Sequence, residues 1–180
     1  MADRRLTLEE CKSVGFTNAA YIDPQKLELL PEVRDMCAVN SCGRYDKSWA
    51  CPPACGSLEE QSKRLRGFSY GVLLQVTEQM EDDFDVEAME RAERLCKEGL
   101  HKLSDQMEGR FTKKLLLGAG TCTVCETCTY PDAPCRFPDK AFASLEACGL
   151  VVSKECERAG IPYYYGPKTI TFTGAVLVTD

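Results

Sequence analysis

The sequence predicts an α+β or α/β sandwich, in which a small mixed sheet packs with helices and carries two cysteine-rich loops. Short apolar runs interleave with amphipathic helical patterns along the chain. Twelve cysteines occur in 180 residues, and most of them gather in two segments, 37–56 and 122–138. The length and an apolar content of 44% fit a single domain over residues 1–180 with an ordinary core.

The N-terminal half contains several helix signals and one strand signal. The first 36 residues carry short helical patterns, with Pro24 and Pro31 where a first helical position favours proline. Ser57-Leu58-Glu59-Glu60 has the form of a capping box and predicts a helix that runs to about Arg66. The apolar run 70–76 predicts a buried strand.

The strongest helical pattern runs from Asp85 to Met107, where apolar side chains recur at steps of three and four and Gly109 follows as a terminator. Residues 114–117 and 169–178 predict two further strands. The remaining patterns predict a helix over 139–148 and a short helix that ends near Gly160. The strand order does not follow from these patterns.

Charge and hydropathy exclude several classes of function. The net charge of −6 gives the chain no general attraction for nucleic acid or anionic membranes. No apolar run approaches the roughly 20 residues of a membrane span, and the N-terminus has no signal-peptide pattern. We therefore expect a cytoplasmic protein. Because a reducing cytoplasm disfavours disulfides, clustered cysteines there are interpreted as metal ligands.

The second cysteine set has the sharper pattern, Cys122-x2-Cys125-x2-Cys128-x6-Cys135. Three thiols at a repeat of three resemble the bacterial ferredoxin run, in which close cysteines bind different irons of one cluster. A single zinc ion usually takes two separated Cys-x2-Cys pairs, so the spacing favours an iron–sulfur cluster. In the ferredoxin run the fourth cysteine serves another cluster, which leaves the assignment of Cys135 open.

The first set, Cys37-x4-Cys42-x8-Cys51-x3-Cys55, is looser. Glycine and proline next to these thiols indicate a chain that turns tightly around a metal. The positive end of the helix that follows Ser57 would favour an anionic cluster, and zinc is a stronger competitor here than at the second set. The one tryptophan, Trp49, either shields a cluster from water or packs in the core.

The other four cysteines receive a structural interpretation. Cys96 lies on the apolar face of the predicted 85–107 helix and is expected to be a small buried hydrophobe. Cys148 and Cys156 are too far apart for a ligand motif, and Cys11 lies near the N-terminus. The sequence leaves open whether one of these four cysteines replaces a member of either ligand set. The single histidine, His101, is expected at the surface rather than in a site.

Several segments together resemble one known family. The segments are Cys42-Gly43-Arg44-Tyr45, Trp49-Ala50-Cys51-Pro52-Pro53, Cys128-Thr129-Tyr130-Pro131, Pro134-Cys135-Arg136-Phe137-Pro138, Tyr165-Gly166-Pro167 and Thr169-Ile170-Thr171. They are similar to domain-of-unknown-function family 2284, a group of predicted metal-binding proteins, from about Cys37 to the end of the chain. The resemblance implies metal binding with the eight clustered cysteines as ligands, and it implies no particular reaction.

Three functions are compatible with this pattern. The favoured hypothesis is a redox protein with two [4Fe–4S] clusters that exchanges electrons with a protein partner. The second is an enzyme or assembly factor with a labile iron site, for which Cys135 or Cys37 would be the weakest ligand. The third is a zinc-bound interaction module without redox chemistry. Whether the chain is an enzyme, and its oligomeric state, do not follow from the sequence.

Overall fold

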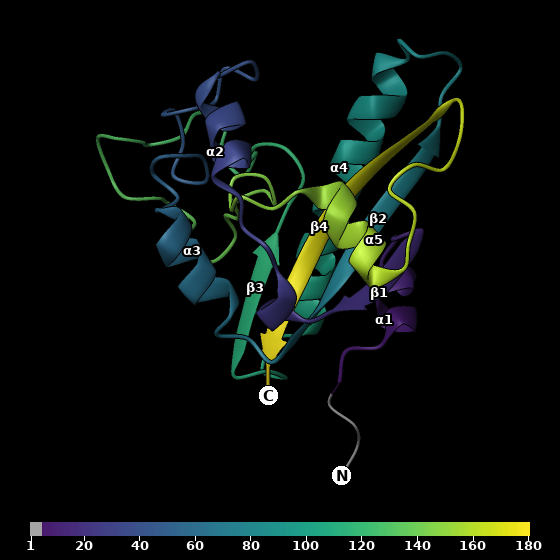
Figure 1. Cartoon of the computed structure of the whole chain (residues 1–180), viewed down its shortest axis with the longest axis horizontal. Helices are drawn as coiled ribbons and strands as arrows, with labels where there is room; N and C mark the ends of the chain where they lie inside the picture. Colours follow the sequence, from purple (N-terminus) through teal and green to yellow (C-terminus); the bar gives the residue numbers. More distant parts are fainter. Residues whose placement is uncertain (1–4) are drawn as a thin grey trace.

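The computed structural model describes residues 5–180, and at its centre lies a four-stranded sheet with helices on both faces (Figure 1). The elements in chain order are α1 (Leu8–Ser13), β1 (Asn18–Ile22), the 3-10 helix η1 (Pro24–Lys26), α2 (Pro31–Ala38), α3 (Leu58–Leu65), β2 (Tyr70–Gln79), α4 (Val86–Gln106), β3 (Lys113–Leu117), α5 (Val152–Ala159) and β4 (Thr169–Thr179). The strand order is β1-β2-β4-β3, and each neighbouring pair is antiparallel. The α+β fold class is thereby confirmed, and the sheet is antiparallel where a mixed sheet was predicted.

The two central strands are apolar on both sides. Leu74 of β2 and Val176 of β4 belong to the core that also contains buried side chains of α1 and α4. Their immediate neighbours on the strands, Leu73 and Leu177, belong to a second core with side chains of α3 and α5. Successive strand residues point to opposite faces, so helices on both sides are needed to keep these strands from water.

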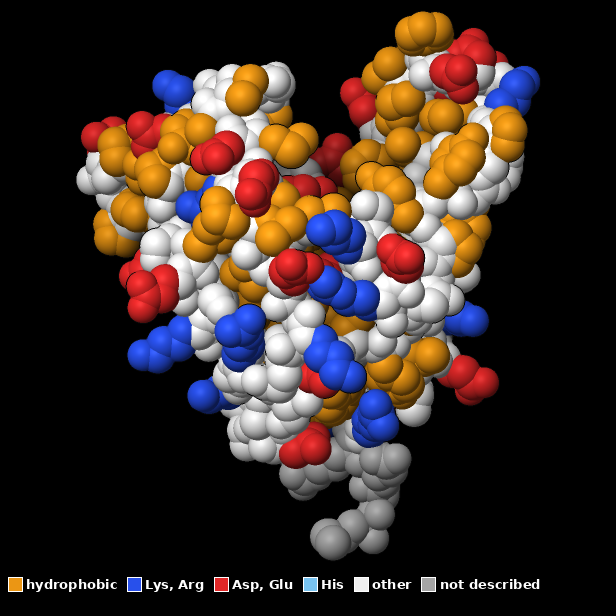
Figure 2. Space-filling model, viewed as in Figure 1, with side chains coloured by type: hydrophobic (Ala, Val, Ile, Leu, Met, Phe, Trp, Pro, Cys, Tyr) orange, Lys and Arg blue, Asp and Glu red, His pale blue; other side chains and the backbone are white. Residues whose placement is uncertain are grey.

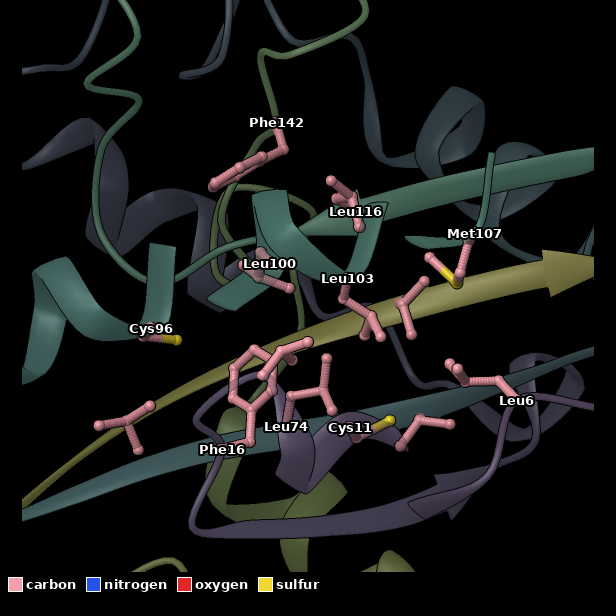
Figure 3. Close-up of a cluster of buried hydrophobic side chains, with 14 of the residues drawn as sticks. Leu6, Cys11, Phe16, Leu74, Cys96, Leu100, Leu103, Met107, Leu116 and Phe142 are labelled. Atoms are coloured by element: carbon pink, nitrogen blue, oxygen red, sulfur yellow. The ribbon is translucent and has the colours of Figure 1, made fainter. Parts of the chain in front are cut away.

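Helix α4 forms much of the first core and confirms the predicted 85–107 helix (Figure 3). Its apolar face presents Cys96, Leu100 and Leu103 to the sheet, and all three are fully buried. The Asp85 carboxylate caps the helix by accepting a hydrogen bond from the Ala88 N–H at 3.0 Å. No helix within residues 5–180 is both long and apolar enough to cross a bilayer.

Most other predicted elements are also confirmed. Ser57 and Glu60 form the predicted capping box, with reciprocal backbone-to-side-chain hydrogen bonds of 3.2 and 2.7 Å. Pro24 and Pro31 each begin a helical segment. The strands predicted over 70–76, 114–117 and 169–178 correspond to β2, β3 and β4, and α5 ends at Gly160. The short edge strand β1 was not predicted.

The predicted helix over 139–148 is wrong. This segment forms turns, and Gly118 pairs with it through hydrogen bonds to the Ala143 carbonyl at 2.9 Å and from the Leu145 N–H at 3.2 Å. Its apolar side chains divide between the two cores, with Phe142 in the first core and Leu145 in the second. A helix presents one apolar face, whereas this segment inserts side chains in two directions to close the end of the sheet.

Truncation of a core side chain tests the role of α4. Leu100→Ala is expected to lower the free energy of unfolding by about 2–5 kcal/mol, because it leaves a cavity in a fully buried position. Lys102 lies on the exposed face of α4, so the control Lys102→Ala should change the free energy of unfolding by about 0.5 kcal/mol or less. Urea unfolding measures both. Similar values for the two variants would contradict the assigned helix face.

Glu10 provides a prediction on pH dependence. Its carboxylate lies 2.5 Å from Arg110, whose hydrogen bonds are the main cause that lowers the pKa of Glu10 from 4.5 to about 2. Because the folded-state pKa is depressed, the stabilisation is present above about pH 4.5 and is lost as the pH falls towards 2. Glu10→Gln should therefore cost about 1 kcal/mol or less at pH 7, since the pair is partly exposed and screened. Urea unfolding at pH 7, 4 and 2.5 tests this, and a cost that does not shrink at low pH would contradict it.

Candidate metal centre

The first cysteine set lies around a cavity beside α2. Cys37, in the last turn of α2, lines this cavity together with Cys42 and Cys51 of the following loop, and its volume is about 400 Å³. The Cys55 thiol lies 3.6 Å from the Ala147 carbonyl. Burial raises the pKa values of Cys37, Cys51 and Cys55, and neighbouring thiols of the same set raise each further. The structure therefore brings all four members of this set near one another.

Tight turns give the loop of the first set its shape. Gly43 has a φ of +69°, a conformation that glycine adopts without strain, and its N–H bonds to the Asn40 carbonyl at 3.0 Å. Asn40 also accepts a hydrogen bond from the Tyr45 N–H through its side chain, at 3.0 Å. The Cys55 N–H bonds to the Cys51 carbonyl at 3.0 Å. These turns bring the chain back on itself between Cys37 and Cys55.

The second set follows strand β3, and within it polar groups act most clearly on the thiol of Cys128. Burial acts to raise the pKa of Cys128, but hydrogen bonds from the backbone N–H groups of Trp49, Tyr130 and Thr129 and from the Ser48 hydroxyl outweigh it. The pKa of this thiol is therefore lowered. Donors of this kind favour the thiolate, which is the form that binds metals.

Trp49 joins the two cysteine loops. Its indole N–H donates to the Ala133 carbonyl at 3.0 Å, and its ring meets that of Tyr130 edge to face at a centroid distance of 4.9 Å. The Tyr130 hydroxyl in turn donates to the carboxylate of Asp46. Trp49 therefore packs on the second loop and not in the core. In Figures 1 and 2 both loops form one projection, which a notch separates from the projection at the start of α4.

The second set adjoins the first near Cys51 and reaches a separate pocket at Cys135. The Cys51 thiol lies 3.8 Å from the hydroxyl of Thr121, which precedes Cys122, so the two sets adjoin at this point. Cys135 lines a separate shallow pocket with Trp49 and Pro134. Within residues 5–180, no three cysteine, histidine, aspartate or glutamate side chains are arranged to hold one metal ion. A single ion bound at either set would therefore require the thiols to move closer together.

The four cysteines outside both sets are all buried. Burial raises the pKa values of Cys11, Cys96 and Cys148 to about 12, which makes them poor thiolates. Cys11 is therefore a core residue, although it lies near the N-terminus. His101 is half-buried against Phe142 at a centroid distance of 5.2 Å, and burial lowers its pKa.

Two residues near the first set were not identified from the sequence. Arg34 donates from its guanidinium to the carbonyls of Ala147 and Gly56. The buried Gln61 donates to the Cys55 carbonyl and accepts from the Cys148 thiol. A signal for Arg34 was present, because it precedes Cys37 by three residues and so shares its helix face.

The comparison with protein families agrees with this geometry. Domain-of-unknown-function family 2284, described as predicted metal-binding proteins, matches residues 20–178. The chain belongs to this family. No curated protein and no solved structure matches the chain. Membership therefore supports metal binding by a cysteine-rich protein of family 2284 and leaves the identity of the metal to chemical argument.

Replacement of Trp49 tests whether it holds the loops together. Trp49→Ala removes both the edge-to-face contact, worth about 0.5–1.5 kcal/mol, and the hydrogen bond to Ala133. We expect faster amide hydrogen exchange over residues 128–135, measured by mass spectrometry. Trp49→Phe, which keeps a ring but lacks the N–H, should give a smaller increase. Unchanged amide hydrogen exchange in both variants would contradict the conclusion that Trp49 holds the two cysteine loops together.

Proposed function

We propose that the chain holds two [4Fe–4S] clusters and exchanges electrons with a protein partner. The proposed ligands of the first cluster are Cys37, Cys42, Cys51 and Cys55, and those of the second are Cys122, Cys125, Cys128 and Cys135. When bound, such clusters supply one-electron transfer at potentials set by hydrogen bonds and nearby charge. The chain's own residues supply thiolates, orient them and stabilise their charge.

The observation that carries this proposal is the cavity of the first set. Three thiols line a volume of about 400 Å³ instead of converging on a point. A zinc ion would hold its sulfurs about 2.3 Å from one centre, whereas each iron of a cluster takes a separate thiolate. The donor chemistry and the room between the thiols therefore fit a cluster.

The hydrogen bonds at Cys128 support the same assignment for the second set. The thiol receives backbone N–H groups from both loops, including that of Trp49 in the first loop. Hydrogen bonds to sulfur stabilise a thiolate cluster and influence its potential. The Cys51 thiol lies 3.8 Å from the hydroxyl of Thr121, the residue before Cys122, so the two proposed ligand sets adjoin each other.

The charge of the chain supports a basic partner. The net charge of −6 would steer a positively charged protein surface towards this molecule and speed the encounter. Such association would weaken with ionic strength because salt screens exposed charges. Nothing in this argument requires nucleic acid or a membrane.

A second candidate function is an assembly factor or enzyme with a labile iron site, and the exposure of Cys42 favours it. Of the twelve cysteines, all of which are among residues 5–180, only Cys42 is exposed. It lies at the cavity with Arg44 and Tyr45. An exposed ligand is easier to displace than Cys37 or Cys135, which are half-buried.

Single cysteine replacements test the two-cluster proposal. Cys125→Ser and Cys51→Ser should each remove about half of the visible absorption that dithionite bleaches in protein purified without oxygen, because each removes a ligand from one set. The control Cys96→Ala changes a buried cysteine outside both sets and should keep the full absorption. Loss of all absorption in either serine variant would contradict two independent sites.

A further inference from the structure

Arg34 of α2 is fixed beside the first cysteine set by two backbone carbonyls. Its Nη1 donates to the Ala147 carbonyl at 2.9 Å, and its Nη2 donates to the Gly56 carbonyl at 2.8 Å. The side chain is half-buried, three residues before Cys37. A planar guanidinium suits this task because its donors form a rigid fork, whereas a lysine ammonium is a point charge.

The Arg34 guanidinium and the Cys55 thiol share a backbone acceptor. The Cys55 thiol donates to the Ala147 carbonyl at 3.6 Å, so this carbonyl is shared with Arg34. Gly56, the other acceptor of Arg34, directly follows Cys55. Arg34 therefore ties the helix that carries Cys37 to the two backbone segments that surround Cys55.

The charge of Arg34 acts on two thiols of this set. The guanidinium shares the Ala147 carbonyl with the Cys55 thiol, and along α2 it lies one helical turn before Cys37. The carboxylate of Glu146 lines the same cavity as Cys37 and brings a negative charge to it. Arg34 and Glu146 therefore place opposite charges beside the first cysteine set.

We propose that Arg34 is a positioning residue that stabilises the reduced form of the first cluster and raises its reduction potential. The inference rests on the proposed function. Reduction adds one electron, and therefore one negative charge, to a cluster already bound by anionic thiolates. A fixed positive charge nearby favours the more negative state, because net charge and hydrogen bonding set cluster potentials. The negative charge of Glu146 would act in the opposite direction and lower the reduction potential of the first cluster.

Potentiometric titration followed by electron paramagnetic resonance tests this role. The titrations use the Cys125→Ser background, in which the first cluster is the one expected to remain. Arg34→Gln should shift the reduction equilibrium about tenfold towards the oxidised form, which corresponds to a potential lower by about 59 mV. Arg34→Lys should lower it less, because it keeps the charge and loses the two-carbonyl geometry. Glu146→Gln should raise it.

Two controls make the test decisive. Arg66→Gln removes an exposed arginine at the end of α3 and should leave the potential unchanged. Where Arg34→Gln fails to retain the cluster, Arg34→Lys and Glu146→Gln still test the sign of the charge effect. An unchanged potential in the Arg34 variants, with the cluster present, would overturn the role of Arg34 alone. A wild-type protein without acid-labile sulfide would overturn the proposed function and this inference together.

Discussion

The packing of Trp49 on the second cysteine loop is the interaction on which the candidate metal centre depends. It joins distant segments through a hydrogen bond to Ala133, 84 positions along the sequence, and a ring contact with Tyr130. The backbone N–H of the same tryptophan is one of the donors to Cys128. One residue of the first loop thus supports a ligand of the second, so the two sets are parts of one structure.

The sheet makes this contact available. Because β2 and β4 are buried on both faces, helices must cover both sides, and the cysteine loops lie where those layers end. Strand β3 lies at the edge of the sheet and leads into the second loop, while the turn around Gly118 pairs with the segment 143–145. The core therefore provides a stable base, and of the proposed ligands Cys55 packs against the second core.

The same division separates the cysteines by chemistry. The four outside both sets are buried in the cores, where desolvation disfavours the thiolate. The eight in the loops are half-buried or exposed. Burial still raises the pKa values of Cys37, Cys51 and Cys55, so these thiols differ from the core cysteines in the degree of burial and not in the direction of its effect. Cys128 is the clearest contrast, since hydrogen bonds lower its pKa in spite of burial.

The sequence predicted the elements whose signals are local. The 85–107 helix has a long apolar stripe and the Ser57 capping box is a short motif, and both occur as expected. The 139–148 segment was predicted incorrectly, because its apolar residues serve two cores that only the tertiary structure defines. The cysteine spacing identified the candidate ligands. It did not reveal the joint at Trp49 or the carbonyls that hold Arg34, which are contacts between distant segments.

The most direct test of the account is the metal and acid-labile sulfide content of the wild-type chain purified without oxygen. Two clusters predict about eight irons and eight sulfides per chain, with little zinc. One or two zinc ions without sulfide would contradict the account, because the thiols would then hold single metal ions in a structural role.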